Sequence, residues 1–385
     1  MRAGLRVFDA DTHISPCAEL LEPYLEPLVR QRIPDLDRYK APIKIGLAGE
    51  VRQEPYRHTY RFAESKGWNS DAIRILGEAA PRAGLQRRFQ KFQGTRFPTE
   101  GGVDDPHIRV ADMDAEGVDV QVMVPAAANA HPDPDIEMAF LRAQHRFLED
   151  FCAPYPHRLK SLIVVSGRAI AESVEEIQRW ATSSWAVGVQ VYLPLDFPID
   201  HPDMDPIWRA TQDAGLCVTH HSHSSGYPGY RDLWSNPFLG RSASHPWEAM
   251  RMLAAFLGGG IMERFPDLRL AVLESGFGWL PFWARRIDDQ MDYMGYVAEG
   301  LQHKPSDCIL GGRFFTSIVL HEGADMVAMV NHMLGDHILM FGSDYPHSES
   351  RFPESVDKVL GWDNLGQAEM HKLMWDNAVR AFGEP

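Results

Sequence analysis

Short apolar segments recur along the chain, and segments with helical spacing of apolar residues separate them. Each apolar segment has four to eight residues and is continuously apolar rather than alternating. Such runs are typical of parallel strands that are buried on both faces. We expect eight strands, at Leu5–Phe8, Val118–Val124, Leu159–Val165, Ala186–Leu193, Leu216–His221, Leu268–Leu273, Phe314–Leu320 and His337–Phe341.

The intervening segments predict helices. They lie at Pro134–Cys152, Glu172–Thr182, Pro206–Ala214, Pro246–Phe265 and Leu280–Val297. Proline at the start of the fourth segment suits a first helical position. Repeated strand–helix–strand units indicate a parallel sheet, and eight of them with polar residues at the strand ends favour an α/β fold of the (β/α)8 TIM-barrel type.

One segment breaks this rhythm. Residues 22–105 are rich in proline, glycine, arginine and aromatic residues and lie between the first and second expected strands. We expect a single domain over residues 1–385, in which 22–105 is a long insertion that acts as a cap or as an oligomer contact.

The charge and cysteine content of the chain argue against several classes of protein. The formal net charge of −15 argues against a protein that neutralises phosphates on nucleic acid or on an anionic membrane. No apolar run approaches the ~18 residues that a membrane span needs, and no signal peptide is visible. The four cysteines are scattered, without a C-x-x-C motif. We therefore expect a cytoplasmic homo-oligomer with a small-molecule substrate.

Histidine and acidic residues gather at the ends of the expected strands. They are Asp11 and His13 after the first strand, His220, His221 and His223 at the fifth, Glu274 after the sixth, and Asp344 and His347 after the eighth. In a barrel these ends open on one face, where catalytic groups lie. Imidazole and carboxylate groups without a thiolate favour zinc, manganese or iron.

Each of these signals has a plainer interpretation. Residues two apart on a strand point to the same side, so Asp11 and His13 can bind one ion, but an isolated D-x-H pair also fits a strand-end hydrogen bond. The three histidines of 220–223 also fit a surface loop. Asp344 could bind metal and act as a general base, or could cap a turn.

Glu274 closes a buried strand, which is costly for a carboxylate without a partner. It fits a metal ligand, a second-shell ligand, an acid catalyst, or an ion-pair partner of Arg285 or Arg286. Weaker candidates are His245 and His321 as proton donors. We assign His223, Arg168 and His347 to substrate binding, because arginine pairs well with a carboxylate.

At this point the sequence resembles the amidohydrolase superfamily, in the branch of aminocarboxymuconate semialdehyde decarboxylase and related metal-dependent hydrolases. The matching segments are VFDADTHISP at 7–16, RVADMDAEGVDVQVMVP at 109–125, IMERFPDLRLAVLESGFGWLPFW at 261–283 and FGSDYPHSE at 341–349. The resemblance implies a metal-centred TIM-like barrel.

The resemblance also implies a ligand set. Asp11 replaces the first histidine of the usual H-x-H motif and His13 matches the second, while the fifth-strand ligand matches His221 or His220 and the eighth-strand aspartate matches Asp344. Glu274 stands where many members carry a catalytic histidine, which raises the possibility of a second ion.

Three functions remain in view. The leading hypothesis is a metal-dependent hydrolase of an amide, ester, thioester or carbon–carbon bond, with one divalent ion or two. The alternative is a non-oxidative, metal-dependent decarboxylase of an aromatic or unsaturated acid. The third is an inactive barrel that serves as a binding protein.

Overall fold

The protein is described here from a computed structural model. The structure describes residues 2–47, 50–60, 62, 105–125, 131–193, 198–221, 237–295, 300–347 and 350–385. Within these residues no helix is long and apolar enough to cross a membrane.

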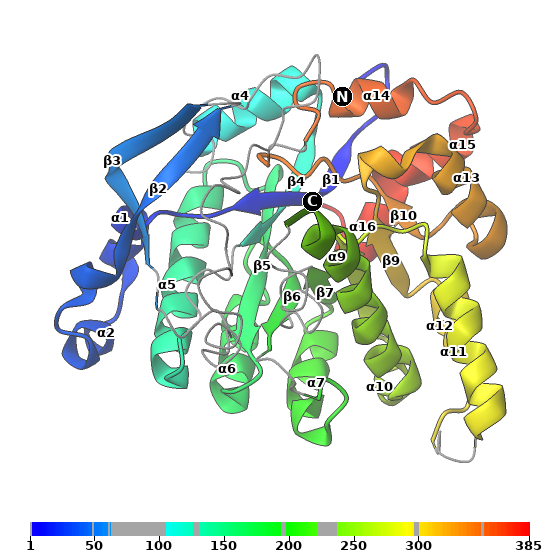
Figure 1. The fold of residues 1–385 in the computed structure, drawn as a ribbon, viewed down its shortest axis with the longest axis horizontal. Helices are drawn as coiled ribbons and strands as arrows, with labels where there is room; N and C mark the ends of the chain where they lie inside the picture. Colours follow the sequence, from blue (N-terminus) through cyan, green and yellow to red (C-terminus); the bar gives the residue numbers. More distant parts are fainter. Residues whose placement is uncertain are drawn as a thin grey trace.

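Eight parallel strands form the barrel predicted from the sequence (Figure 1). They are β1 (Phe8–Ile14), β4 (Val120–Pro125), β5 (Leu159–Ser166), β6 (Ala186–Tyr192), β7 (Cys217–His221), β8 (Arg269–Leu273), β9 (Phe314–Ser317) and β10 (Leu339–Met340), and they pair in this order. Residues just past β10 close the ring against β1, because Ala10 N donates to Phe341 O at 2.9 Å and His13 N donates to Tyr345 O at 2.7 Å. The barrel is thus nearly closed.

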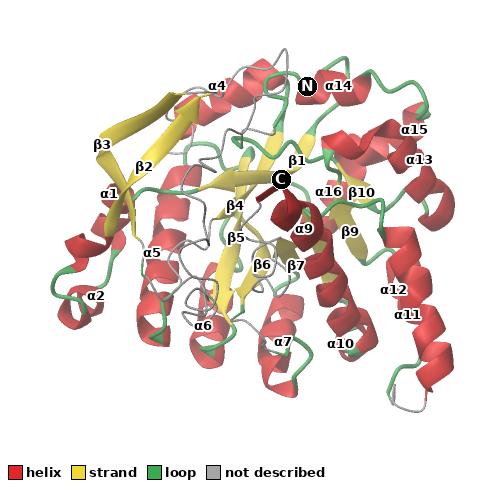
Figure 2. Ribbon diagram, in the orientation of Figure 1, coloured by secondary structure: helices red, strands yellow, loops and turns green. Residues whose placement is uncertain are grey.

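Helices cover the outside of the strands (Figure 2). The longer ones are α4 (Pro106–Glu116), α5 (Pro134–Cys152), α6 (Ile170–Trp180), α7 (Asp205–Asp213), α9 (Pro237–Leu253), α11 (Leu280–Met294) and α13 (Gly323–Leu334). Shorter ones are α1 (Ala18–Leu21), α2 (Pro27–Arg32), α10 (Ile261–Arg264), α12 (Pro305–Leu310), α14 (Ser355–Leu360), α15 (Gln367–His371) and α16 (Asn377–Phe382). Single turns are η1 (Glu22–Tyr24), η2 (Leu36–Tyr39), η4 (Pro202–Met204), η5 (Ala254–Gly258), η7 (Leu320–Glu322) and η8 (Lys372–Asp376).

Several element boundaries differ from the prediction, and two of the differences matter most. The first strand is Phe8–Ile14 rather than Leu5–Phe8, so the acidic residues taken for its end lie within it, where hydrogen bonds offset their burial. The expected helix Pro246–Phe265 is α9, η5 and α10 in succession, and Pro246 lies inside α9. The helix at Pro134–Cys152 agrees with the prediction at both ends.

Part of the 22–105 insertion is described. It contains α2 and a two-stranded antiparallel sheet of β2 (Lys40–Leu47) and β3 (Glu50–Tyr60), which stands beside the barrel near α1 (Figure 1). Its role as a cap or oligomer contact stays a prediction, as does the cytoplasmic location.

Residues of η8 and of the C-terminal helix α16 pack against the barrel strands. Phe8 of β1 packs on Trp375 and Phe382, with ring centroids 5.5 and 6.4 Å apart. Both partners belong to one apolar cluster with inward residues of β4, β5, β8 and β9. Phe8 is the first residue of β1, so Trp375 and Phe382 lie at the amino-terminal end of that strand.

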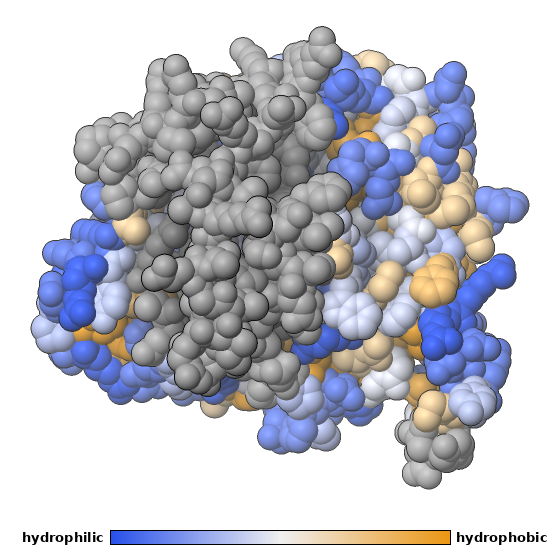
Figure 3. All heavy atoms as spheres, in the orientation of Figure 1, coloured by the Kyte–Doolittle hydropathy of each residue, from blue (hydrophilic) through white to orange (hydrophobic). Residues whose placement is uncertain are grey.

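The surface is less distinctive. On the face shown in Figure 3 the described residues are mostly polar, and the apolar ones lie in separate small spots. Exposed large apolar residues of the described chain are Trp247, Phe282, Tyr293, Met294, Leu310 and Met333.

Candidate metal centre at the carboxyl ends of the strands

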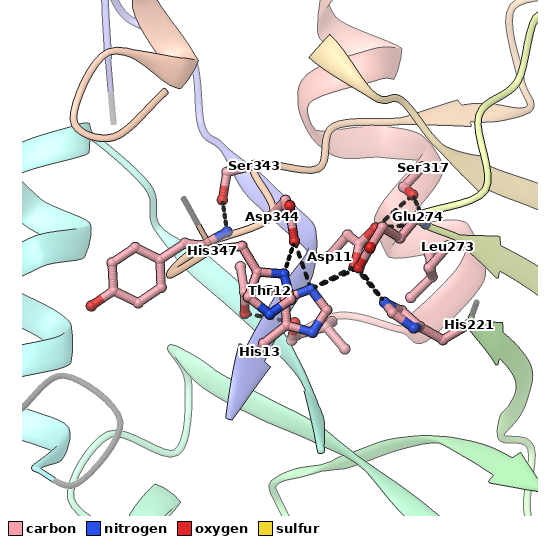
Figure 4. Close-up of polar contacts among 12 residues, drawn as sticks. Asp11, Thr12, His13, His221, Leu273, Glu274, Ser317, Ser343, Asp344 and His347 are labelled. Carbon is pink, nitrogen blue, oxygen red and sulfur yellow. Dashed lines mark hydrogen bonds and ion pairs between the residues drawn. The ribbon is translucent and has the colours of Figure 1, made fainter. Parts of the chain in front are cut away.

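Four barrel segments bring five of the predicted ligands together, as Figure 4 shows. Asp11 and His13 lie on β1 and His221 ends β7. Glu274 follows β8, and Asp344 follows β10. All five residues are buried except Asp344, which is half-buried. Residues that are up to 333 positions apart (Asp344 minus Asp11) thus share one cluster.

His13 is the centre of the cluster. Its Nε2 lies 2.8 Å from Asp344 Oδ1 and 3.2 Å from Glu274 Oε2. His221 Nε2 lies 3.0 Å from the same Glu274 oxygen. Glu274 therefore joins the two imidazoles, and its side chain has not turned outward to form only a surface ion pair; Arg286 pairs with Asp289 instead.

Asp11 turns its two carboxylate oxygens to different partners. Oδ2 accepts hydrogen bonds from Ser317 Oγ at 2.8 Å and from Glu274 N at 2.9 Å. Oδ1 faces His221 Nε2 at 3.7 Å and His13 Nε2 at 3.9 Å, and it has no hydrogen-bond partner in the described part of the chain. A buried oxygen of this kind needs a partner that lies between it and the imidazoles.

The geometry separates His221 from His220. Neighbouring residues of a strand point to opposite sides, and His221 points to the acidic cluster (Figure 4). His220 is buried elsewhere, where burial, followed by the charges of His221 and of Arg251 on α9, lowers the pKa of its imidazole to about 3. Of the two residues left open by the sequence, His221 is placed to bind an ion.

The contacts within the cluster shift the pKa values of its histidines and carboxylates. Burial opposes the charge of His13, yet hydrogen bonds to Asp344 and Glu274 raise its pKa well above the usual range. Burial likewise opposes ionisation of Glu274, but His221 and His13 hold its pKa well below the ordinary value. The imidazoles of His13 and His221 thus lie between carboxylates, where a divalent ion would offset the negative charge.

Two site carboxylates sit on unusual backbone. Glu274 has φ of +47° and Asp344 has φ of +61°, both in the left-handed region. This conformation costs non-glycine residues about 1–3 kcal/mol each and tends to occur at functional sites. Hydrogen bonds offset the cost, because Glu274 N donates to Asp11 Oδ2 and Asp344 N donates to Asp11 O at 3.0 Å.

The residues present fit a divalent metal ion. The candidate ligand atoms of two overlapping groups, one with His347 and one with Asp11, lie within 4.8 Å of one another in each group. Two ligands that bind one ion at ~2.1 Å stand roughly 3.0–3.5 Å apart, close to the distances between His13, His221 and Glu274. The donors are nitrogen and oxygen, and all four cysteines are free and buried away from the cluster.

Arg109 binds the β1 backbone that carries His13. It was not among the residues predicted from the sequence. Its fully buried guanidinium donates from Nη1 to His13 O at 2.9 Å, from Nη2 to Thr12 Oγ1 at 2.8 Å and from Nε to Gln121 Oε1 at 2.9 Å. These bonds hold the β1 backbone that carries His13. Arg109 opens the segment 109–125 that carries part of the resemblance, but its contact with the β1 backbone forms only in the folded chain, so the sequence alone did not show this role.

A pocket of about 310 Å³ opens beside the carboxylates. Asp11, Glu274 and Asp344 line one part of it, and Trp279, Ile318 and Leu320 provide apolar walls. His245, His321 and Arg351 also line it, as do several backbone segments. Arg351 is a functional candidate that the sequence prediction missed, since it stands seven residues past Asp344 in a stretch without a motif.

The two predicted proton donors lie at this pocket at different depths. His245 Nδ1 is 3.2 Å from Glu274 O and 3.7 Å from Glu274 Oε1, so it borders the metal centre. His321 is exposed, on η7.

Of the described residues that were predicted to bind substrate, only His347 contacts the cluster. His347 stacks on His13 with ring centroids 4.0 Å apart, and its Nδ1 is 2.6 Å from Asp344 Oδ1. Arg168 pairs with Glu137 at 2.5 Å and donates to backbone oxygens of His131 and Pro132, so its guanidinium is committed elsewhere. His223 lies outside the described residues.

Backbone amides of the turn after Glu274 bind the carboxylate of another residue of the chain, Glu322. Glu322 on η7 accepts from Phe277 N at 3.2 Å and from Gly278 N at 2.7 Å. Gly276 has φ of +70°, and a Cβ there would stand 2.3 Å from Glu322 Oε1. The turn that carries Glu274 is thus tied to the segment that carries His321.

Barrel and cluster together define a metal-centre (β/α)8 enzyme. The family model described as amidohydrolase matches residues 9–383. The chain therefore belongs to the amidohydrolase family.

Solved structures share this fold at low sequence identity. An amidohydrolase from Mycobacterium avium subsp. paratuberculosis has a TM-score of 0.71 at 17% identity, covering 98% of this chain and 99% of its own. Manganese-bound 5-carboxyvanillate decarboxylase from Novosphingobium aromaticivorans has 0.69 at 17%, covering 99% and 97%. A 2,6-dihydroxybenzoate decarboxylase from Rhizobium has 0.66 at 15%, covering 98% of each chain.

These comparisons correct the leading prediction of a hydrolase. The similar structures whose reactions are named act on 5-carboxyvanillate and 2,6-dihydroxybenzoate, and they are decarboxylases. The alternative prediction agrees better with them. The segments that suggested hydrolysis build a metal centre, and a metal centre of this kind is compatible with either reaction.

Proposed function

We propose that this protein is a metal-dependent, non-oxidative decarboxylase of a small aromatic or unsaturated acid. The observation that carries the proposal is the buried cluster in which Asp11 Oδ1 and the Nε2 atoms of His13 and His221 face one another beside an open pocket. The named reactions of similar structures give the reaction type.

The ligands would be Asp11, His13, His221, Glu274 and Asp344, which all turn an oxygen or nitrogen atom into the cluster. When bound, a divalent ion would hold oxygens of the substrate and draw electron density from them. Manganese is the first ion to test, because three similar decarboxylase structures contain it. Titration of metal-free protein with Mn²⁺, Zn²⁺ and Fe²⁺ distinguishes the three ions and counts the ions bound per chain.

The pocket fits the proposed substrate class. Trp279, Ile318 and Leu320 can pack against a flat apolar body, while the Arg351 guanidinium offers the cation that a carboxylate needs in an acidic site. We assign the contact with the substrate carboxylate to Arg351 rather than Arg168, because Arg351 lines this pocket.

Decarboxylation breaks one carbon–carbon bond, releases carbon dioxide and leaves an electron pair on carbon that must take up a proton. Asp344 lines the pocket, and its Oδ1 lies 2.6 Å from His347 Nδ1. We assign the proton for carbon to this hydrogen-bonded pair, with His347 partly exposed to solvent. His245, which borders Glu274, is the second candidate donor.

Two sets of variants test the proposal. Asp11→Ala combined with His13→Ala is expected to lose bound metal, measured by elemental analysis of purified protein, whereas Arg351→Met is expected to keep the metal and raise KM for an acid substrate about tenfold or more. Unchanged metal content in the first variant, or an unchanged KM in the second, contradicts the corresponding assignment.

A further inference from the structure

Ser317 occupies the junction of three strands that build the centre. Its side chain is fully buried at the end of β9. Its Oγ donates to Asp11 Oδ2 at 2.8 Å and accepts from Glu274 N at 3.1 Å (Figure 4). One hydroxyl thus contacts a carboxylate of β1 and the backbone that carries a carboxylate of β8.

We propose that Ser317 is a positioning residue that selects which oxygen of Asp11 faces the metal centre. The inference rests on the proposed function, because the centre in question is that of the proposed decarboxylase. With Ser317 Oγ and Glu274 N both bound to Oδ2, that oxygen has its donors, and Oδ1 is left to face His13 and His221. Asp11 therefore offers one oxygen in a fixed direction.

The same hydroxyl secures Glu274. The left-handed backbone at Glu274 is held by the hydrogen bonds from its amide to Asp11 Oδ2 and Ser317 Oγ. Removal of the hydroxyl leaves this amide with Asp11 Oδ2 as its one acceptor and removes one of the two donors that hold the Asp11 carboxylate. Partners that orient a ligand in this way commonly change metal affinity by about 10–100-fold.

Close packing makes serine the suitable residue at this place. A Cβ on Gly342 would lie 2.9 Å from Asp11 Cβ and 3.1 Å from Ser317 Cβ, so the chain past β10 already presses on both residues. A side chain that branches at Cβ or extends past the γ position has little room at 317, whereas alanine removes the hydroxyl and adds no atom.

The test measures Mn²⁺ affinity of metal-free protein by competition with a fluorescent chelator, without substrate. Ser317→Ala is expected to weaken Mn²⁺ binding about 10–100-fold and to alter the visible spectrum of the Co²⁺-substituted protein. The matched control is Ser161→Ala, which removes another fully buried hydroxyl that bonds across strands, to Met123 O at 2.7 Å, away from the centre. This control is expected to keep Mn²⁺ affinity within about twofold of the unmodified protein, since it touches no ligand.

Affinity in Ser317→Ala within about threefold of the unmodified protein, or an equal loss in Ser161→Ala, overturns the inference. Should Ser317→Ala not fold, Ser317→Cys provides the measurement, because its weak S–H donor predicts an intermediate loss and unchanged affinity overturns the inference. If the unmodified protein binds no Mn²⁺, Zn²⁺ or Fe²⁺, the proposed function itself fails, and the assignment of Ser317 fails with it.

Discussion

His13 contacts carboxylates on two sides while its ring stacks on His347, so its charge responds to any ion that enters the cluster. Burial opposes the charge of both imidazoles, yet Asp344 and Glu274 raise the pKa of His13 well above its usual range, and Glu274 and Asp11 raise the pKa of His221. Both imidazoles must be neutral to bind metal.

This protonation predicts pH-dependent metal binding. Ion binding displaces protons from His13 and His221, so affinity rises with pH and keeps rising above the ordinary histidine pKa of ~6.5. Calorimetric titration of Mn²⁺ in buffers of different ionisation enthalpy measures the released protons. A titration that is independent of pH between about 6 and 8, with no proton release, contradicts this arrangement of ligands.

His220 makes a separate prediction about acid stability. Its folded-state pKa is about 3, below the unfolded value of ~6.5, so its contribution to stability is present above ~6.5 and is lost as pH falls towards 3. His220→Leu is expected to lower the midpoint of acid unfolding by roughly half a pH unit or more, whereas the exposed His332→Gln is not. Circular dichroism followed as a function of pH measures the midpoint of acid unfolding of each variant. Equal midpoints in the two variants would contradict the prediction.

The turn between β8 and α11 is the element on which the centre depends most. It carries Glu274 in a left-handed conformation, and Glu322 on η7 binds its amides. Because the Glu322 carboxylate occupies these amides, the turn is a fixed part of the scaffold.

Gly276→Ala tests this fixed turn. The new Cβ meets Glu322 Oε1 and forces alanine to φ of +70°, so we expect a loss of about 1–3 kcal/mol of unfolding free energy. Gly258→Ala, which places its Cβ in open space at a conformation open to alanine, is expected to change stability by less than about 0.5 kcal/mol. Urea titration compares them, and equal stabilities would show that Glu322 does not hold the turn.

The strands could be predicted from sequence because burial on both faces leaves continuous apolar runs. β1 was placed too early because Asp9, Asp11 and His13 interrupt its apolar pattern, and only partners from distant strands make their burial possible. The same distance hides Ser317 and Arg109, whose roles come from contacts that the chain makes after folding. The ligand types were visible because they stand at strand ends, whereas the side to which His220 points was not.

At the scale of the whole molecule, the barrel has one blocked end and one open end. The C-terminal helix α16 packs under β1, β8, β9 and β10, and Phe382 is buried there against Phe8. Because this end is filled with apolar side chains, substrate access is confined to the end where the carboxylates lie.

Phe382→Ala tests the blocked end. Loss of a buried phenylalanine is expected to cost about 3–5 kcal/mol of unfolding free energy, while Phe282→Ala, at a side chain that is 61% exposed, is expected to change it by less than about 0.5 kcal/mol. Denaturant titration distinguishes them. A loss below about 1 kcal/mol at Phe382 would mean that α16 contributes little to the barrel core.

The central claim is that the metal centre performs decarboxylation. The most direct measurement is the rate of carbon dioxide release from a panel of hydroxybenzoates and unsaturated acids, followed as Mn²⁺ is added to metal-free protein. We expect release from at least one acid to rise in proportion to bound Mn²⁺ and to fall about 100-fold or more in Asp344→Asn. Protein saturated with Mn²⁺ that releases no carbon dioxide from any acid of the panel would contradict the claim.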